Sequence, residues 1–389
     1  MQIEELHLVD VRSYLAADVT FGPGVSVLLG PNAQGKTNLL EAMQRLATGG
    51  SHRVSSDGPL VRMDGADVGV IRAVLRTDEG RRRTVEIEIG TGRRTRTRVD
   101  GQDVKRTADA IGVLRAVLFA PEDLAIVRGD PSERRRFLDE LLVQRRPAYA
   151  ATKSDYDRAL RQRNALLKSG RGLRGSAAEA MQDTLAVFDE QLIRHGATVW
   201  AARLAAVHAL SGPVDVAYRD VADRPEPITM TYRAAAGSEV VGTPGSGVPD
   251  PAPLAQELRL ALERNAVDER RRGTTLVGPH RDEIELKIGA LPAKGYASHG
   301  ETWSLALALK LGVHEVIADV GDRPIVLLDD VFAELDTIRR QKLADACARF
   351  DQVIVTAAVE EDVPLAGVRY DVAIRDGVSQ VVRRAEGPA

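Results

Sequence analysis

Four residues near the N-terminus have the types and the spacing of a phosphate-binding loop. Gly30, Gly35, Lys36 and Thr37 satisfy the pattern G-x-x-x-x-G-K-[ST] within the stretch "LLGPNAQGKTNLLEAM". The glycines let the backbone wrap closely, so that its N–H groups and the N-terminus of the following helix meet phosphate oxygens. Lys36 would reach the β- and γ-phosphates, and the Thr37 hydroxyl would coordinate Mg²⁺. A chance match in an ordinary strand-to-helix turn is the alternative, but an apolar run precedes the loop and a helical run follows it, as the motif requires.

The residues expected to contact a nucleotide are those of the loop and of the helix start. They are Gly30, Pro31, Asn32, Ala33, Gln34, Gly35, Lys36, Thr37 and Asn38.

Two carboxylates near the other end of the chain supply the complementary chemistry. "IVLLDD", Ile325 to Asp330, is an apolar strand that ends in an aspartate pair, as expected of a Walker B strand beside the strand that precedes the loop. Asp329 would hold Mg²⁺, directly or through water, and Asp330 would orient or deprotonate an attacking water. The alternative is an aspartate pair that only caps the next turn. Lys36, Asp329 and Asp330 are therefore the candidate catalytic residues, and Thr37 and Asp329 the candidate metal ligands.

The elements that must position these residues lie at both ends of the chain. Residues 1–121 contain mostly strands, with a helix from Lys36 to about Leu46 and three β-rich runs, "VGVIRAVLRT", "RRTVEIEIG" and "TRTRVDG", separated by Gly-containing turns. Residues 273–389 alternate strands and helices: "RPIVLLDDV", a helix over 337–350, "QVIVTAA", and a closing pair "YDVAIRDG" and "SQVVRR". This pattern predicts an α/β fold.

The middle of the chain, residues 122–272, is predicted to be mostly helical. Asp130 and Pro131 are suited to a helix start, a second helical run covers 148–168, and a third runs from Ser176 to about Leu210, roughly 50 Å at 1.5 Å per residue. The last two indicate an antiparallel hairpin, an arm, with an ordinary core pair as the alternative. "VDVAYRD" and "ITMTYR" are strand candidates, the Gly/Pro/Ser-rich stretch near 234–253 is predicted to be a mobile loop, and a helix is expected over about 254–270.

Composition sets limits on the class of protein. A chain of 389 residues is longer than one hydrophobic core usually organises. With 44% hydrophobic and 28% charged residues, it should fold as a soluble globular protein. It contains no apolar stretch long enough to span a bilayer, so we expect a cytoplasmic location and no membrane partner. The single cysteine, Cys347, excludes an intramolecular disulfide framework, and no Cys/His metal cluster is available.

Arginine clusters indicate where nucleic acid could bind, although the net charge is only −3. In "RRTRTR", the period of a strand places Arg94, Arg96 and Arg98 on one face as a phosphate-contacting strip. A charged edge strand that prevents aggregation is the alternative. The turn "GPHRDE" presents His280, Arg281 and Asp282 just before a strand. We expect this turn to lie near nucleotide or DNA, with Arg281 as a candidate DNA contact, over a purely structural turn.

A third motif stands about 30 residues before the Walker B strand. In "YASHGETWSLALALKLG", Ser298 and Gly300 precede an apolar helix, and "AELD", ending in Asp336, follows the strand. These stretches resemble the signature motif and the D-loop of ABC-type ATPases. Together with "LVDVRSY", "SHRV", "LFAPEDLAIVRGDPSERRRFLD" and "TLVGPHRDEIEL", in that order over nearly the full length, they resemble the RecF family of bacterial DNA recombination and repair ATPases, relatives of SMC and Rad50 heads.

The resemblance implies a P-loop, ABC/Rad50-like ATPase head of mixed sheets and helices with an inserted helical arm. It implies that two heads dimerise around two ATP molecules, with Ser298 and Gly300 reaching the γ-phosphate bound by Lys36 of a second copy and Asp336 at the dimer seam. The ATP-bound homodimer would grip DNA at gaps or junctions, and hydrolysis would release it. RecR and RecO are the implied partner proteins, and recombinase loading on gapped single-stranded DNA is the implied task.

Several positions depart from the family pattern. Gln is usual where this chain has His299 and Glu301, and Ser is usual at Ala333, which puts the polar network around the signature in question. Asp330 stands where most ABC ATPases have the longer Glu, so slow, DNA-stimulated hydrolysis that acts as a switch is expected. Thr356 stands where ABC transporters have a switch histidine, and its role is open. A transporter's nucleotide-binding subunit and an architectural protein with structural ATP are the alternative functions.

Overall fold

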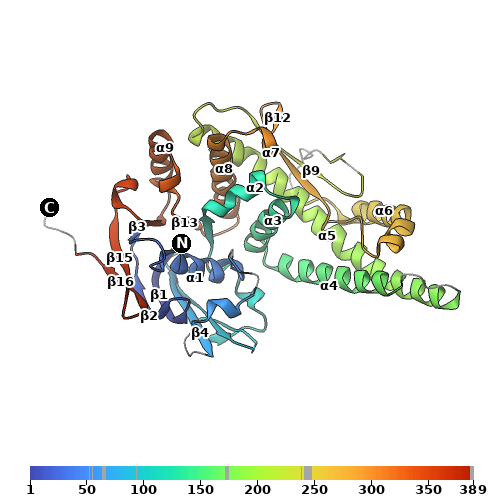
Figure 1. Cartoon of the computed structure of the whole chain (residues 1–389), viewed down its shortest axis with the longest axis horizontal. Helices are drawn as coiled ribbons and strands as arrows, with labels where there is room; N and C mark the ends of the chain where they lie inside the picture. Colours follow the sequence, from blue (N-terminus) through green and yellow to red (C-terminus); the bar gives the residue numbers. More distant parts are fainter. Residues whose placement is uncertain are drawn as a thin grey trace. The chain divides into compact units, whose positions relative to one another are not determined.

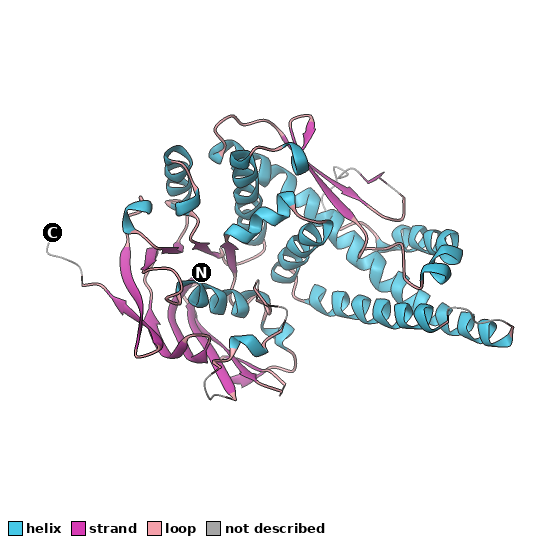
Figure 2. Cartoon of the chain, in the orientation of Figure 1, coloured by secondary structure: helices cyan, strands magenta, loops and turns pink. Residues whose placement is uncertain are grey.

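Two units, each with its own internal packing, divide the chain. The structure is a computed structural model that describes residues 1–51, 53–54, 56–63, 67–92, 94–170, 175–237, 239–240 and 248–385. The first unit contains Met1–Leu124, Val216–Pro225 and His299–Ala389, and the second contains Ala125–Asp215 and Glu226–Ser298. Figure 1 labels the helices and strands, and Figure 2 colours them by type. Most strands belong to the first unit, and most of the long helices belong to the second.

The first unit is built on two six-stranded sheets. One is antiparallel, in the order β2-β1-β4-β5-β6-β7, and comprises β1 (Gln2–Val11), β2 (Tyr14–Thr20), β4 (Val68–Arg76), β5 (Arg82–Gly90), β6 (Arg96–Val99) and β7 (Gln102–Asp103). The other, in the order β16-β15-β3-β14-β13-β8, comprises β3 (Gly24–Leu29), β8 (Ala116–Phe119), β13 (Ile325–Asp329), β14 (Gln352–Ala357), β15 (Val368–Arg375) and β16 (Val378–Arg383). Five of its strands run parallel and only β16 is antiparallel.

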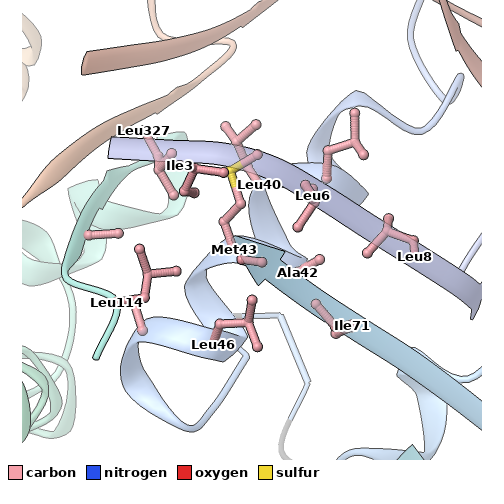
Figure 3. Close-up of a cluster of buried hydrophobic side chains, with 14 of the residues drawn as sticks. Ile3, Leu6, Leu8, Leu40, Ala42, Met43, Leu46, Ile71, Leu114 and Leu327 are labelled. Carbon is pink, nitrogen blue, oxygen red and sulfur yellow. The ribbon is translucent and has the colours of Figure 1, made fainter. Parts of the chain in front are cut away.

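Helix α1 (Lys36–Thr48) lies in the shared core of these two sheets. Its side chains are buried on nearly every face, because strands contact it from both sides. Figure 3 shows Met43 and Leu46 of α1 among Leu6 of β1, Ile71 of β4 and Leu327 of β13. The unit also contains α8 (His299–Ala318), α9 (Thr337–Cys347) and short 3-10 helices at Gly58–Leu60, Thr107–Ala110, Pro121–Asp123, Phe332–Glu334 and Glu360–Asp362; α2 (Leu124–Arg128) begins at its last residue before the second unit. Packing of α1 between two sheets fixes the helix that carries Lys36 and Thr37.

The helices of the second unit form the predicted antiparallel pair and add a third member. The pair is α4 (Ala148–Ser169) and α5 (Ser176–Val221), whose last residues, from Val216 on, belong to the first unit; α6 (Pro251–Arg272) is the third member, and α3 (Pro131–Arg145) precedes them. Arg163 of α4 lies 2.5 Å from Asp189 of α5, and Tyr156, about two turns earlier in α4, packs at Gly196, further along α5. The two helices therefore run in opposite directions. A Cβ at Gly196 would lie 2.9 Å from Leu258 of α6, so this glycine permits close packing of three helices instead of breaking α5.

Helix α5 is longer than its sequence pattern indicated. It has 46 residues, about 69 Å at 1.5 Å per residue, and continues through Pro213. The stretch "VDVAYRD", predicted as a strand, is its last part. The prediction was wrong because the buried residues, Val214, Ala217, Tyr218 and Val221, follow helical spacing, whereas Val216 is 59% exposed.

The second unit has a four-stranded sheet that explains where it ends. Its order is β10-β9-β11-β12, with β9 (Ile228–Arg233), β10 (Glu239–Val240), β11 (Glu283–Ile288) and β12 (Leu291–Pro292), followed by the short α7 (Ala293–Tyr296). "ITMTYR" is β9, as predicted. Since β11 pairs with β9, the chain stays in this unit to Ser298, beyond the boundary expected at residue 272. Residues 238 and 241–247 of the predicted mobile loop lie outside the described residues.

None of the described helices has both the length and the apolar character that a membrane-spanning segment needs.

Candidate functional site

The loop between β3 and α1 curls around the ammonium group of Lys36. Lys36 is only 3% exposed. Its Nζ donates hydrogen bonds to the carbonyl oxygens of Gly30 at 2.7 Å and Pro31 at 3.1 Å. Pro31, Asn32 and Ala33 form the exposed rim of the loop. A cation held inside a ring of backbone groups, at a helix N-terminus, is suited to bind phosphate oxygens.

Glycine is required at the end of the loop. Gly35 has φ of +107°, and a Cβ there would lie 2.6 Å from Ser379 Oγ, 2.9 Å from Ser13 Oγ and 3.0 Å from Tyr14 Oη. At Gly30, an added Cβ would collide with the carbonyl oxygen of Val372. The two motif glycines thus serve close approach between the loop and its neighbours as well as backbone conformation.

Four polar residues, which we name the loop clasp, connect the loop to its surroundings by hydrogen bonds: Ser13, Gln34, Asn38 and Ser379. Ser379 Oγ lies 2.7 Å from Ser13 Oγ and 2.8 Å from the carbonyl oxygen of Gln34, while Asn38 Nδ2 donates to Ser13 Oγ at 2.9 Å. The Gln34 side chain accepts from the N–H of Ile374 at 2.7 Å. Gln34 and Asn38 were expected to contact nucleotide, whereas Ser13 and Ser379 were missed because serines carry no motif.

A buried ion-pair network supports the other side of α1. Glu41 is fully buried and accepts hydrogen bonds from Arg12 Nε at 2.9 Å, from Arg12 Nη2 at 2.7 Å and from Ser51 Oγ at 2.5 Å. Burial raises the pKa of Glu41, but the hydrogen bonds from Arg12 and Ser51 and the charges of Arg12 and Arg53 outweigh it, and the pKa falls below its ordinary value. Arg53 also donates to Asn38 Oδ1 at 3.1 Å, so the network connects to the loop clasp.

The structure brings the two predicted motifs together. Thr37 Oγ1 donates to Asp329 Oδ1 at 3.0 Å, although the residues are 292 positions apart. Burial raises the pKa of Asp329, and hydrogen bonds from Thr356 and Thr37 oppose this. A hydroxyl and a carboxylate within one hydrogen bond are the kind of oxygen ligands that Mg²⁺ prefers. The site therefore fits Mg²⁺ held by Thr37 and Asp329.

The Walker B strand is not directly beside the loop strand, contrary to the sequence-based expectation. β14 lies between β3 and β13, and pairs with both in parallel. Because all three strands end at the same edge, Thr37 still reaches Asp329. The intervening strand places Thr356 next to Asp329, where its hydroxyl donates to Asp329 Oδ1 at 2.7 Å.

Asp330 leaves the strand in an unusual conformation. Its φ is +49°, in the left-handed region that few residues other than glycine adopt. Its N–H donates to Thr356 Oγ1 at 2.8 Å, and its buried Oδ1 has no hydrogen-bond partner among the described residues. A carboxylate oxygen without a protein partner beside a phosphate loop is suited to hold a water.

The signature and the D-loop meet at one arginine. The N–H of Arg339 donates to Asp336 Oδ1 at 2.9 Å, so that Asp336 caps α9, and the Arg339 guanidinium pairs with the same carboxylate. A Cβ at Gly300 would lie within contact of that guanidinium, so Gly300 and the D-loop meet at Arg339. Among the departures from the family pattern, His299 and Ala333 are exposed and Glu301 is half-buried; Ser298 is exposed and belongs to the second unit.

The arginine strip borders a groove of about 820 Å³ at the edge formed by β6 and β7. The predicted alternation is present, with Arg96 exposed and Thr97 buried, but the arginines differ in their partners. Arg98 pairs with Glu86 at 2.8 Å and Asp103 at 3.0 Å, and Arg94 donates to the carbonyl of Lys105 at 2.7 Å. The groove is lined by Val68, Glu88, Gly90, Arg94, Thr95, Arg96, Thr97, Asp103, Val104, Lys105, Arg106 and Thr107.

The "GPHRDE" turn is braced by buried side chains of the second unit. Asp282 accepts from Tyr232 Oη at 2.6 Å and from the N–H of Ala235 at 2.7 Å, and His280 Nδ1 lies 2.6 Å from Tyr156 Oη. Burial raises the pKa of Asp282 and lowers that of His280 to about 4. These contacts favour a structural role for both residues. Arg281 is the exposed member, and its guanidinium donates to the carbonyl oxygen of Thr275.

Comparison with known proteins finds close relatives over almost the whole chain. The family model described as the RecF/RecN/SMC N terminal domain matches residues 2–380. A DNA replication and repair protein RecF from Streptomyces avermitilis is 50% identical over 375 residues, covering 96% of this chain and 98% of the relative. RecF from Cutibacterium acnes is 49% identical over 381 residues, covering 96% of each.

Solved structures agree with this result. A structure of the recombination mediator protein RecF of the RecFOR pathway with ATPrS matches with a TM-score of 0.86 and 27% identity over 98% of each chain. The corresponding structure with ATP matches with a TM-score of 0.82. An Smc head domain from Pyrococcus furiosus matches with a TM-score of 0.54 and 17% identity over 98% of this chain and 96% of that one, which shows a shared fold. The predicted ABC/Rad50-like α/β head is thereby confirmed.

Proposed function

Because this chain belongs to the RecF family, we propose that it is an ATP-gated DNA-binding protein of recombinational repair and replication-gap processing. The observation that carries the proposal is the hydrogen bond between Thr37 and Asp329, which joins the phosphate loop and the Walker B strand into one site. Relatives of known structure bind ATP or ATPrS, and this site supplies the residues to hold ATP with Mg²⁺.

In this proposal the chain's own groups divide the work at the nucleotide. The curled loop and Lys36 bind the phosphates, and Thr37 and Asp329 hold Mg²⁺, which when bound neutralises charge on the phosphate oxygens. Asp330 orients the attacking water through its unpartnered oxygen. Asp330 is one methylene shorter than the usual glutamate, so we infer slow, DNA-stimulated hydrolysis that times release instead of driving movement.

ATP would act between two copies of the chain. Ser298 and Gly300 of one copy contact the γ-phosphate held by Lys36 of the other, and Asp336 lies at the seam. The dimer grips DNA at gaps or junctions, works with RecR and RecO, and assists recombinase loading on gapped single-stranded DNA. Full-length identity to DNA replication and repair proteins favours this function over a transporter subunit or a purely architectural protein.

Measurement of the oligomeric state tests whether ATP controls dimerisation. Molar mass would be measured by light scattering with and without ATP and gapped DNA, for wild type, Lys36→Ala and Asp330→Asn. We expect wild type to dimerise with ATP, Lys36→Ala to stay monomeric, and Asp330→Asn to remain dimeric for longer because it binds but does not hydrolyse. A mass that is the same with and without nucleotide in all three proteins would refute the gate.

The groove at β6 and β7 supports a DNA contact for the arginine strip. Among the described residues, the side chains of Arg96 and Lys105 have no ion-pair partner, whereas Arg98 is held by two carboxylates. We propose that Arg94, Arg96 and Lys105 contact phosphates and that Arg98 contributes less. Arg281, exposed on its braced turn, is a second candidate contact.

Salt dependence of DNA binding separates these residues. Arg96→Ala with Lys105→Ala should reduce the slope of log K against log salt by about 2, since each phosphate contact on duplex DNA contributes about 0.9. Arg83→Ala is the matched control, because Arg83 lies on the neighbouring strand and pairs with Asp100 at 2.6 Å. Equal slopes for the double variant and the control would remove the groove from the DNA-binding surface.

A further inference from the structure

Thr356 occupies the position between the two halves of the nucleotide site. It lies at the carboxyl end of β14, in register with Leu28 of β3 on one side and with Asp329 of β13 on the other. The residue is fully buried. The sequence placed Thr356 at the position of a transporter's switch histidine but left its role open, and the strand order β3-β14-β13 creates its place beside Asp329.

The Thr356 hydroxyl makes two hydrogen bonds, and both are with the Walker B pair. It donates its one hydrogen to Asp329 Oδ1 at 2.7 Å and accepts the N–H of Asp330 at 2.8 Å. A hydroxyl can do both at once, whereas a carboxylate cannot donate and an ammonium cannot accept. A single oxygen atom, Thr356 Oγ1, thus bonds to both the carboxylate of Asp329 and the backbone N–H of Asp330.

These bonds control the orientation of both aspartates. The N–H of Asp330 turns to the Thr356 side chain just after the last paired residue of β13, where the chain adopts φ of +49°. Asp329 Oδ1 is shared between the hydroxyls of Thr356 and Thr37, so the same contact also aligns the Walker B carboxylate with the phosphate loop.

We propose that Thr356 is a positioning residue for ATP hydrolysis, which holds Asp329 and Asp330 in their working orientation without touching the nucleotide. The inference rests on the proposed ATPase function. A misplaced catalytic group lowers the rate of the chemical step far more than it lowers nucleotide binding, and displacement of about 1 Å can cost about 100-fold. Loss of the hydroxyl should therefore separate turnover from affinity.

Three variants test the proposal in the full chain. Thr356→Val keeps the shape and removes both hydrogen bonds, and Thr356→Ser restores them. Thr275→Val is the matched control: Thr275 is equally buried, and its hydroxyl also accepts one bond, from Arg163 at 2.9 Å, and donates one, to Asn164 at 2.7 Å, but it lies in the second unit. Turnover with DNA, affinity for a fluorescent ATP analogue and melting temperature would be measured for each.

We expect Thr356→Val to lower kcat by about 10- to 100-fold with affinity within about threefold of wild type. Thr356→Ser should recover most of the rate, and Thr275→Val should keep it. The proposal is overturned if Thr356→Val turns over as fast as the Thr275 control, if Thr356→Ser is as slow as Thr356→Val, or if affinity falls in proportion to rate. Wild type without hydrolysis would instead overturn the proposed ATPase function, and this inference with it.

Discussion

The neutral ring of His280 predicts how the second unit responds to acid. A carbonyl oxygen only accepts, so His280 Nε2, 3.3 Å from the oxygen of Thr275, carries the hydrogen, and Nδ1 accepts from Tyr156 Oη at 2.6 Å. Burial is the main cause that lowers the pKa of His280 from 6.5 to about 4; the charges on Arg281, Arg135 and Arg163 act in the same direction, and the hydrogen bond to the Thr275 carbonyl opposes them. Burial and the three arginines thus outweigh the Thr275 hydrogen bond and favour the uncharged ring.

The sign and size follow from linkage. Between pH 6.5 and pH 4, His280 binds a proton in the unfolded chain but stays neutral in the folded unit. The free energy of unfolding therefore decreases as the pH falls from 6.5 towards 4. With these two pKa values, this one residue lowers the free energy of unfolding by about 2 kcal/mol between pH 7 and pH 5. The full loss, below pH 4, is about 3 kcal/mol at 1.36 kcal/mol per pKa unit.

Urea unfolding of wild type and His280→Asn would measure this contribution. Trp200, buried in α5, reports on the second unit once Trp303 of the first unit is changed to Phe in both proteins. Carboxylates that titrate in the same range act equally in the two proteins, so their effect cancels in the comparison. Wild type should lose about 2 kcal/mol more than the variant between pH 7 and pH 5. The same pH dependence in both proteins, within about 0.5 kcal/mol, would show that the ring is not held neutral.

Two further substitutions test the packing of each unit. Gly35→Ala places a Cβ against Ser379 and Ser13 at a φ of +107°, so affinity for a fluorescent ATP analogue should fall at least about tenfold, that is by about 1.4 kcal/mol; unchanged affinity would mean that the loop adjusts freely. Arg203→Met removes the buried partner of Asp139, which Arg203 binds through two 2.9 Å bonds, so urea unfolding should show a loss of about 3–5 kcal/mol. A loss below about 1 kcal/mol would mean that water reaches Asp139.

The chemistry of the site could be predicted from the sequence because the residues that carry it form short local motifs. The phosphate loop and the aspartate pair each occupy a few adjacent residues with a fixed spacing, and the structure joins them through Thr37 and Asp329. The roles of Ser13, Ser379 and Thr356 could not be predicted in the same way, although the position of Thr356 was noted. Serine and threonine occur everywhere, and what makes these three important is a strand order that no short stretch encodes.

The type of an element could be predicted where its sequence has one buried face. The prediction failed where the apolar residues fit both the strand period and the helix period. In "VDVAYRD", Val214, Val216 and Tyr218 alternate as in a strand, but Val216 is exposed and the buried set follows the helix. Register was a second limit. The sequence places Arg96 and Arg98 on one face, but only the pairing of β5 with β6 sets Glu86 opposite Arg98 and neutralises it.

The order of strands in the second sheet also fixes when the protein can finish folding during synthesis. β3 lies between β14 and β15, and Gln352 of β14 bonds to Ile3 across 349 positions of sequence. At about 5–20 residues per second, a ribosome needs roughly 17 to 70 seconds to bridge that interval. Throughout this time β3, with its apolar "VLL", has neither neighbour. The nascent N-terminal segment is therefore a natural client for chaperones, and the nucleotide cradle is completed only after β16 has emerged.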